Sequence, residues 1–374
     1  MKKGFLSMKK LGFGLMRLPM MGEGESAVID IEQTKRMVDE FMARGFTYFD
    51  TAWMYIGHRS EAATKEVLVD RYPRESFTLA TKLHAGYIKT HEDRDTVFNE
   101  QLRKTGAGYF DYYLIHDVRK SHYEIYNKLD CFTWLQEKKR QGLVRHMGFS
   151  FHDSAEFLDQ VLTEHPEMEF VQLQINYLDW ESDNVQSRKC YEVACKHGVP
   201  VIVMEPVKGG TLANVPAPVE QMFKAQRQDL SVPSWAIRFA ASLDNVMVVL
   251  SGMSSMEQMT DNLGYMENFV PLTEKETDMV MRAAEMVKSG IAIPCTACSY
   301  CTEGCPMSIN IPEYFAIYNK EMRRENQDPA AAYAEISAKG GKASECIACG
   351  QCEAICPQEL PIIEHLKSVG DYFE

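Results

Sequence analysis

Two features are missing from this sequence: a long apolar run and a concentrated stretch of basic residues. No apolar run approaches the ~20 residues that an α-helix needs to cross a bilayer. The formal net charge is −13, and no basic stretch stands out that could neutralise phosphates. The sequence therefore predicts neither a membrane partner nor a nucleic-acid partner, and it favours a small-molecule substrate.

Two cofactor signatures are missing as well. A doubly wound open sheet that binds a dinucleotide carries a GxGxxG fingerprint after its first strand, but Gly12-Phe13-Gly14 stops short of it. No flavin motif is recognisable either, although barrels bind flavin phosphate without one. These absences disfavour the open sheet and leave the need for a flavin open.

Short β-rich runs alternate with longer helical patterns over most of the chain. This alternation is typical of βα units around a parallel sheet, and several runs are continuously apolar, as in strands buried on both faces. Eight runs before residue 285 predict an α/β fold, a (β/α)8 TIM barrel. The predicted strands are 11–16, 46–51, 77–83, 109–116, 144–150, 170–176, 199–205 and 246–252, and the clearest helices between them are 31–44, 59–70, 93–104, 154–164 and 187–197.

At 374 residues the chain is long enough for one large domain and a smaller one. We expect the barrel to occupy residues 1–285 and a small, mostly helical, dicluster ferredoxin-like domain to occupy residues 286–374. A helix at 273–289 leads out of the barrel, and the patterns at 314–324 and 329–338 indicate two more helices.

Cysteines form two runs of the same spacing near the C-terminus. The first is Cys295-x2-Cys298-x2-Cys301-x3-Cys305-Pro, and the second is Cys346-x2-Cys349-x2-Cys352-x3-Cys356-Pro. This is the spacing of bacterial ferredoxins that ligate [4Fe–4S] clusters, in which the fourth cysteine ligates the other cluster. A zinc knuckle or a disulfide framework is less consistent with two complete quartets. We therefore predict two clusters, one held by Cys295, Cys298, Cys301 and Cys356 and the other by Cys346, Cys349, Cys352 and Cys305.

Three further cysteines, Cys131, Cys190 and Cys195, stand singly in helical patterns, and we expect them to be buried free thiols. Reduced thiols together with oxygen-sensitive clusters indicate a cytoplasmic protein.

Four polar residues occupy the ends of consecutive predicted strands, where the active site of a barrel lies. Asp50 ends the second strand and Tyr55 follows it, Lys82 ends the third strand, and His116 ends the fourth. A tyrosine beside an ammonium group forms a proton-donating device, because the positive charge favours phenolate and lowers the tyrosine pKa. Asp50 would keep Lys82 charged, and His116 would either hydrogen-bond a carbonyl oxygen or help to relay the proton.

The same residues resemble the tetrad of the aldo-keto reductase family. Asp50-x-Ala-x-x-Tyr55-x-Gly, then Thr81-Lys82, then Leu-Ile-His116 follow the family order, and residues 142–150 resemble its fifth-strand motif. The resemblance covers roughly residues 5–285. It implies hydride transfer between a nicotinamide and a carbonyl carbon, with Tyr55 as general acid, tuned by Lys82 and Asp50, and with His116 orienting the carbonyl.

The resemblance also implies a nicotinamide site and shows where it departs from the family. Ser150 and Gln172 match the positions that hold the carboxamide, and Asn262 matches the asparagine that binds adenine. Met204 replaces an aromatic residue whose ring commonly stacks on the nicotinamide. Pro206 lies in the same segment, and we assign both residues to the cofactor site. Gly252 and Gln258 replace the lysine and arginine that bind the 2′-phosphate, so NADH and NADPH both stay open as the cofactor. Phe151 replaces an asparagine beside the carboxamide site.

Three functional hypotheses follow for a chain that resembles the aldo-keto reductases with a C-terminal [4Fe–4S] domain. The first is a carbonyl reductase or alcohol dehydrogenase whose clusters exchange electrons with a redox partner protein or serve regulation. The second is an electron-transfer module whose barrel has diverged from reductase chemistry, and the third gives the clusters a structural role only. Because hydride carries two electrons and a cluster accepts one, a direct route between them needs a one-electron splitter such as flavin.

Overall fold

The computed structural model describes residues 8–22, 27–322 and 328–374. These residues form two compact units, each built from two separate segments of the sequence. The first comprises residues up to Pro206 together with Ser234–Lys275, and the second comprises Val207–Pro233 together with Glu276–Glu374. No helix in the described ranges is long and apolar enough to cross a membrane.

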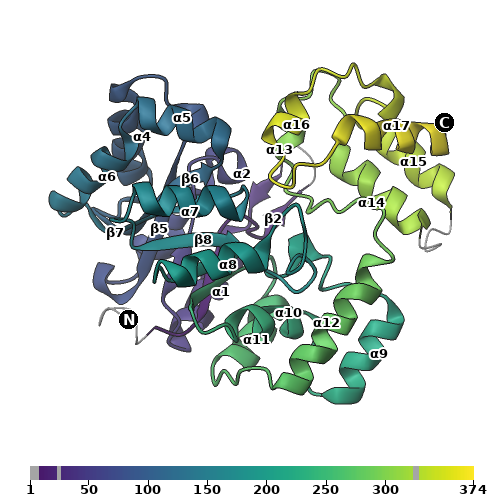
Figure 1. Ribbon diagram of the computed structural model, residues 1–374, viewed down its shortest axis with the longest axis horizontal. Coiled ribbons are helices and arrows are strands. Elements are labelled where there is room, and N and C mark those ends of the chain that lie inside the picture. Colours follow the sequence, from purple (N-terminus) through teal and green to yellow (C-terminus); the bar gives the residue numbers. More distant parts are fainter. Residues whose placement is uncertain (1–7, 23–26, 323–327) are drawn as a thin grey trace. The chain divides into compact units, whose positions relative to one another are not determined.

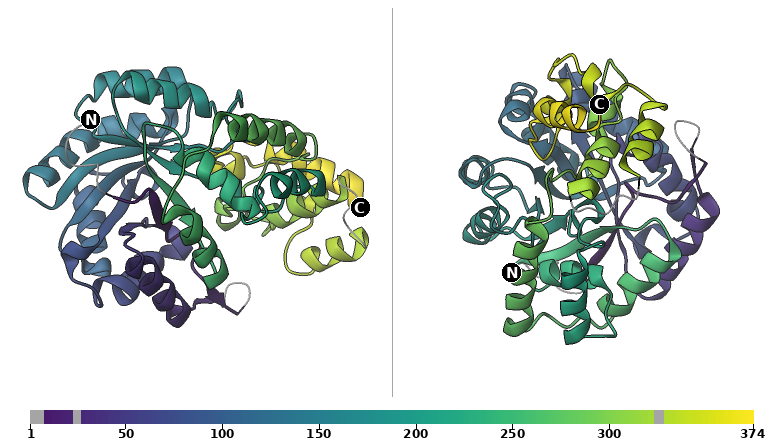
Figure 2. Two further views of the ribbon diagram at one scale, coloured as in Figure 1. Left: turned by 90° about the horizontal axis from the view of Figure 1, so that it is seen from below. Right: turned by 90° about the vertical axis from the view of Figure 1, so that its right-hand side faces the viewer.

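The first unit is a closed barrel of eight parallel strands with helices around it, so the predicted TIM barrel is confirmed (Figures 1 and 2). The strands follow the order β1-β10-β9-β8-β7-β6-β5-β4, and β1 pairs with β4 to close the sheet. Each predicted strand overlaps one barrel strand. The observed strands are β1 (Leu11–Gly14), β4 (Tyr48–Asp50), β5 (Thr78–His84), β6 (Phe110–Val118), β7 (Val144–Phe151), β8 (Phe170–Gln174), β9 (Val201–Met204) and β10 (Val246–Gly252).

Two short strands that the sequence did not indicate lie outside the barrel. They are β2 (Met20–Met21) and β3 (Val28–Ile29), which pair antiparallel. Each has only two residues, so neither carries the alternating pattern from which a strand is predicted.

Local sequence signals explain where the barrel helices begin and end. In α1 (Ile31–Ala43) the carboxylate of Asp30 accepts a hydrogen bond from the Gln33 N–H, which satisfies one free donor of the first turn. In α4 (His91–Thr105) Thr90 and Asp93 form a capping box, and Gly106 ends the helix in the left-handed conformation. The other helices of this part are α5 (Lys120–Lys128), α6 (Cys131–Arg140), α7 (Ala155–Glu164), α8 (Ser187–Lys196), α10 (Val232–Ala241) and α11 (Met256–Met266).

The helix predicted at 59–70 divides into two helical types. It consists of α3 (Ser60–Thr64) followed by a π-helical turn at Lys65–Val69. Two other helical turns, at Arg74–Ser76 and Ala85–Tyr87, are of the 3-10 type. A hydrophobic pattern does not distinguish these variants from an α-helix, and π-turns inside helices are frequent near functional sites.

The second unit is helical, as predicted. It contains α9 (Ala217–Gln226), α12 (Glu274–Lys288), α13 (Tyr300–Glu303), α14 (Ile311–Met322), α15 (Pro329–Ser337), α16 (Gln351–Ile355), α17 (Ile362–Phe373) and 3-10 turns at Lys208–Gly210 and Ala343–Glu345. The helix predicted at 314–324 begins three residues earlier, and its last two predicted residues lie outside the described ranges. The core of the second unit includes the buried side chains of Tyr314, Phe315, Tyr333, Leu366 and Val369.

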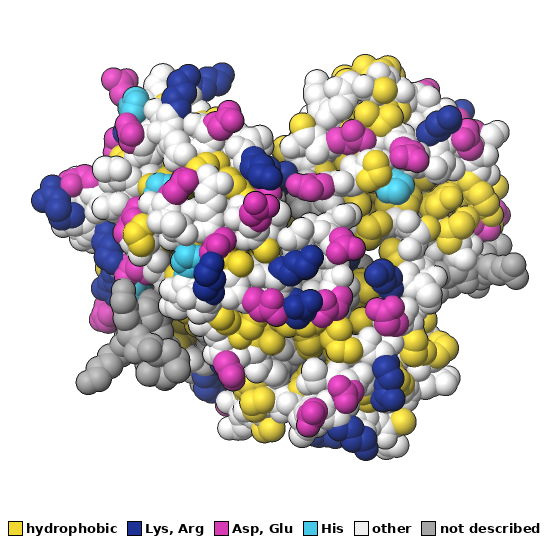
Figure 3. Space-filling view, viewed as in Figure 1, with side chains coloured by type: hydrophobic (Ala, Val, Ile, Leu, Met, Phe, Trp, Pro, Cys, Tyr) yellow, Lys and Arg dark blue, Asp and Glu magenta, His cyan; other side chains and the backbone are white. Residues whose placement is uncertain are grey.

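Charged side chains of both signs are mixed on the surface. On the face drawn in Figure 3, basic and acidic side chains lie interspersed rather than gathered into a basic patch. Many of these charges are paired on the surface of a helix, for example Arg140 with Glu137 and Arg188 with Glu192. Exposed pairs of this kind contribute ~0.5 kcal/mol or less to stability.

Candidate active site and cysteine cavities

The four predicted catalytic residues come from neighbouring elements at the C-terminal end of the barrel. Asp50 is the last residue of β4, and Tyr55 begins the short helix α2 (Tyr55–His58) that follows it. Lys82 and His116 lie within β5 and β6, whose ladder pairs Lys82 with Leu114 and His84 with His116. Both strands run two residues beyond the predicted functional positions, so these two side chains are inside the strands rather than at their ends.

A buried ion pair joins Lys82 and Asp50. The Lys82 Nζ donates to Asp50 Oδ1 and also to the Thr51 carbonyl oxygen at 2.8 Å. The Lys82 and Asp50 side chains are 0% and 3% exposed. Burial lowers the pKa of Lys82 and raises the pKa of Asp50, and the opposite charge of each partner counteracts these shifts. The predicted pairing of these two residues is therefore present in the structure.

A hydrogen-bonded group of buried polar side chains supports the strand that carries Lys82. Glu61 Oε1 accepts from Thr81 Oγ1 and from Gln101 Nε2, each at 2.8 Å. The Gln101 amide also donates to the Lys82 carbonyl oxygen at 3.0 Å. Because buried polar groups are costly unless they are hydrogen-bonded, this network specifies one position for the β5 backbone.

Tyr55 lies over the ion pair. The Lys82 Nζ is 4.9 Å from the centre of the Tyr55 ring, and the Tyr55 and His116 ring centres are 6.2 Å apart, edge to face. Ile56, directly after Tyr55, adopts a left-handed φ of 52°, which is rare for a β-branched residue. Such strain persists where the surroundings demand one geometry, and here it turns the chain immediately beyond the tyrosine.

The pKa of Tyr55 shifts in the opposite direction to the one predicted from Lys82 alone. Burial, followed by the negative charges of Asp50 and Glu205, raises the pKa of Tyr55 well above 10. The prediction considered only the ammonium group of Lys82. It did not include the desolvation of the Tyr55 phenol or the negative charge of Glu205. Tyr55 is therefore held in its protonated form.

His116 is a buried, neutral imidazole. It is 7% exposed, and among the described residues its Nδ1 has no hydrogen-bond partner. Burial, followed by the positive charges of His84 and Lys82, lowers the pKa of His116 well below 6.5. A buried polar atom without a partner fits a position where a substrate or cofactor atom binds.

Asp117, Arg119 and His84 form a polar cluster beside His116 that was not predicted from the sequence. Asp117 has a left-handed φ of 57°, and its carboxylate binds Arg119 at 2.7 Å and faces His84 Nε2 at 3.6 Å. His84 Nδ1 accepts the Gly86 N–H at 3.0 Å, which orients the ring with Nε2 toward Asp117. The only signal in the sequence would have been the Asp-x-Arg that follows His116, and that pattern is too common to predict a site.

Three predicted cofactor residues lie near the ends of the next barrel strands, and Pro206 follows the last of these strands. Ser150 is near the end of β7, and its Oγ accepts a hydrogen bond from the Asp117 N–H at 2.7 Å. Gln172, in β8, donates to Asp50 Oδ2 at 3.5 Å. Met204 is the last residue of β9. The barrel therefore presents these side chains at the same end as Tyr55 and His116.

The remaining predicted cofactor residues already have partners within the barrel. Gln258 Oε1 accepts from the Ser254 N–H at 2.7 Å. Asn262 is buried, and its amide donates to Ser251 Oγ at 2.7 Å and accepts from the Tyr265 hydroxyl. The amide oxygens of both residues are therefore engaged within the barrel.

Gly252, at the end of β10, leaves room that Arg17 fills. A Cβ atom on Gly252 would lie 3.4 Å from the Arg17 side chain, whose guanidinium is 4.0 Å from Glu205. The Arg17 side chain therefore packs beside Gly252, and its guanidinium lies close to a carboxylate.

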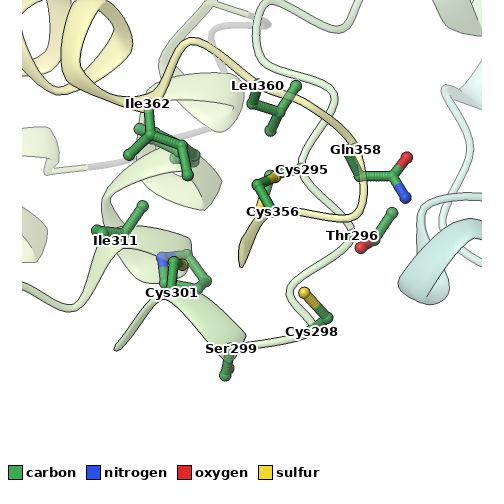
Figure 4. Close-up of a pocket in the computed structure, with 12 residues that line it drawn as sticks. Cys295, Thr296, Cys298, Ser299, Cys301, Ile311, Cys356, Gln358, Leu360 and Ile362 are labelled. Atoms are coloured by element: carbon green, nitrogen blue, oxygen red, sulfur yellow. The ribbon is translucent and has the colours of Figure 1, made fainter. Parts of the chain in front are cut away.

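The cysteines of the second unit gather into the two predicted sets. One cavity is lined by Cys295, Cys298, Cys301 and Cys356 (Figure 4). A second cavity is lined by Cys305, Cys346, Cys349 and Cys352. The fourth cysteine of each run thus joins the first three of the other run, and four soft sulfur donors around one cavity fit a [4Fe–4S] cluster.

The two cysteine runs share one backbone geometry. Left-handed residues recur two positions after the first cysteine and one position after the second, at Ala297 and Ser299 in the first run and at Ala348 and Gly350 in the second. In the first run the Ala297 N–H donates to Cys295 Sγ at 3.4 Å. Successive N–H groups in such turns form concave sites for negative charge, which suits a thiolate-bound cluster.

The three single cysteines do not all behave as predicted. Cys131 and Cys190 are buried, and burial raises the pKa of both thiols to about 12. Cys195 is exposed, so the prediction of a buried thiol was wrong for this residue. It follows Ala194, which faces the barrel, and a helix turns the next residue away from that face.

Comparisons with known proteins agree with this architecture, that of a barrel oxidoreductase with an iron–sulfur domain. Residues 10–285 match the model of the aldo/keto reductase family, which spans most of the chain. The chain belongs to this family and is an NAD(P)-dependent oxidoreductase. Residues 294–360 match a 4Fe-4S dicluster domain, which supports two [4Fe–4S] clusters. A search of curated proteins finds no match.

Solved structures resemble the barrel. A thermostable aldo-keto reductase in complex with the inhibitor epalrestat shares 21% identity over 73% of this chain and 94% of its own, with a TM-score of 0.59. The holo form of an aldo-keto reductase from Bacillus halodurans shares 23% identity over 73% and 91%, with a TM-score of 0.58. An aldo-keto reductase from Klebsiella pneumoniae in complex with NADPH shares 18% identity over 74% and 90%, with a TM-score of 0.56. At these identities the likeness supports the fold.

The buried ion pair generates a prediction about stability. Lys82→Met leaves the Asp50 carboxylate buried without its partner, so we expect the free energy of unfolding to fall by about 3–5 kcal/mol. The double variant Lys82→Met/Asp50→Leu removes both charges and should be more stable than the single variant. Urea unfolding followed by circular dichroism measures both.

Lys65→Met is the matched control, because Lys65 pairs with Asp70 on the surface, where the side chains are 43% and 53% exposed. Loss of this pair should cost no more than about 1 kcal/mol. If the Lys82 and Lys65 variants lose equal stability, the buried pair does not have the importance assigned to it.

Proposed function

We propose that the barrel reduces the carbonyl group of an aldehyde or ketone, or oxidises the corresponding alcohol, with Tyr55 as the general acid and base. The observation that carries this proposal is the convergence of Tyr55, His116 and the Lys82–Asp50 pair at one end of the barrel. We propose that residues 1–285 form the reductase domain and residues 286–374 form the cluster domain.

Each residue has a separate role in the proposed reduction. A bound reduced nicotinamide supplies hydride to the carbonyl carbon. Tyr55 gives its hydroxyl proton to the carbonyl oxygen, and the Lys82 ammonium, 4.9 Å from the ring, stabilises the phenolate that remains. Asp50 keeps Lys82 charged despite burial. The neutral His116 ring hydrogen-bonds the carbonyl oxygen and orients it toward Tyr55.

The nicotinamide would be held by residues at the same end of the barrel. Ser150 and Gln172 are proposed to bind its carboxamide, Met204 and Pro206 to contact its ring, and Asn262 to bind adenine. The structure offers neither a lysine at position 252 nor an arginine at position 258 for a 2′-phosphate. Arg17, whose side chain lies beside Gly252, is the nearby cation.

The eight cysteines of the two cavities are proposed to ligate the two clusters in the sets that line each cavity. A cluster bound there carries one electron at a time. The cysteines fix its place, and the Ala297 N–H, which donates to Cys295 Sγ, offsets part of its negative charge. We propose that the clusters exchange electrons with a redox partner protein rather than with the hydride site.

The alternative function is an electron-transfer module whose barrel no longer reduces carbonyls. The missing 2′-phosphate cations and the engagement of Gln258 and Asn262 with neighbouring groups favour it. The alternative does not require a proton donor at position 55, which separates it from the reductase.

Replacement of the Tyr55 hydroxyl tests the reductase. Tyr55→Phe should lower kcat for the reduction of small aromatic and aliphatic aldehydes by about 10²–10⁴-fold, since a positioned general acid contributes that much. Binding of NADPH or NADH, measured by quenching of protein fluorescence, should be unchanged.

Tyr87→Phe is the control, because it removes a hydroxyl from a ring in the turn that follows β5, 5.9 Å from the His84 ring centre. We expect this variant to keep its activity. Wild-type protein without aldehyde reductase activity, or Tyr55→Phe with full activity, would favour the electron-transfer module.

The pKa shifts predict a broad pH range for the reduction. Because burial and neighbouring carboxylates raise the pKa of Tyr55 above 10, the proton donor stays loaded up to that pH. Because burial lowers the pKa of His116 below 6.5, the ring stays neutral down to that pH. The single-turnover rate of nicotinamide oxidation should therefore be level between about pH 6.5 and 10. A descending limb inside this window would show that Tyr55 loses its proton earlier.

A further inference from the structure

A buried lysine lies in the turn that follows β9. Lys208 is 2% exposed and adopts a left-handed φ of 46°, which is unfavourable for a residue with a Cβ atom. A buried ammonium needs partners that offset its loss of hydration. A strained backbone at a buried lysine points to a function for the side chain.

The Lys208 turn packs against the loop that carries the first cysteines. Lys208 Nζ donates to Gln358 Oε1 at 3.5 Å, and Gln358 lines the cavity of Cys295, Cys298, Cys301 and Cys356. Thr296, between the first two cysteines, lines the same cavity. A Cβ atom on Gly209 would lie 2.0 Å from the Thr296 carbonyl oxygen, so the two backbones meet where only glycine fits.

This contact explains why residue 209 is a glycine. In a TIM barrel a Gly-Gly pair after the seventh strand often belongs to a phosphate site. Here the glycine permits the close approach of the cysteine loop, which holds Lys208 beside the cavity. No sequence pattern signals this role, because it depends on a contact between segments far apart in the chain.

The two cysteine cavities differ in their nearest charges. Gln358, which accepts a hydrogen bond from Lys208 Nζ, lines the first cavity. Glu353, next to Cys352, accepts the N–H of Ile363, and Ile363 lines the second cavity. The first cavity therefore has a buried lysine nearby and the second has a carboxylate.

We propose that Lys208 raises the reduction potential of the cluster held by Cys295, Cys298, Cys301 and Cys356 above that of the second cluster. Reduction adds one electron, and hence one negative charge, to a cluster that thiolates already make negative. A nearby buried cation stabilises the reduced form more than the oxidised form. The first cluster is then the one that accepts an electron first.

This inference rests on the proposed ligation of the clusters. An anaerobic redox titration of the full chain with both clusters reconstituted, reduced stepwise with dithionite and followed by electron paramagnetic resonance, tests it. Wild-type protein should show two midpoint potentials. In Lys208→Met the higher one should fall, so that the ratio of reduced to oxidised cluster at a fixed potential drops about tenfold, or 59 mV for a one-electron couple.

Three comparisons isolate the charge. Lys208→Arg keeps the charge and should stay close to the wild-type potential. Lys224→Met removes a lysine of the same unit whose side chain is 60% exposed, and it should move neither potential. Lys208→Gln repeats the neutral substitution with a polar side chain beside Gln358, in case Lys208→Met loses iron.

The proposal is contradicted if only the lower potential shifts, if both potentials shift equally or if neither shifts. It is also contradicted if Lys208→Arg lowers the higher potential as much as Lys208→Met does. If both neutral variants lose iron while the arginine variant keeps it, Lys208 retains the cluster rather than setting its potential, and the proposal also fails. If the wild-type protein assembles no cluster, the ligation itself is wrong.

Discussion

The active end of the barrel depends on the burial of one ammonium group. Lys82 is fully buried, and it is tolerated because Asp50, on the neighbouring strand, provides a counter-charge. The register of β4 and β5 pairs Asp50 with Ala80, so Lys82 extends back from two residues further along. Breaking a buried pair leaves an uncompensated charge, which makes this register costly to change.

The same pair also affects the residues around it. The carboxylate that neutralises Lys82 also raises the pKa of Tyr55, while the positive charge of Lys82 helps to keep His116 neutral. Burial is the largest cause of both pKa shifts, and the charges of this pair reinforce it, so that Tyr55 keeps its proton and His116 does not take one. These are the states that carbonyl reduction requires of the two groups.

Much of this arrangement could be predicted from the sequence, because it depends on local patterns. The eight strands are apolar runs of the right length, and the two cysteine quartets have a spacing that fixes which sulfurs can meet. The tetrad residues fall on consecutive strands, so a barrel fold brings them to one end.

The rest depends on contacts that no local pattern encodes. The sign of the Tyr55 pKa shift comes from burial, from Asp50 and from Glu205, a residue distant in the sequence. The packing of the Lys208 turn on the cysteine loop joins segments almost ninety residues apart, and it places residues 207–233 in the same compact unit as the clusters.

The central claim is that hydride chemistry in the barrel and electron storage in the clusters are separate, because one moves electrons in pairs and the other singly. Anaerobic stopped-flow mixing of cluster-loaded protein with NADPH or NADH, with cluster absorbance followed, tests it most directly. The account predicts no bleaching of the clusters by nicotinamide, together with aldehyde-dependent oxidation of the nicotinamide. Bleaching faster than aldehyde turnover would contradict it and would require a one-electron splitter within the protein.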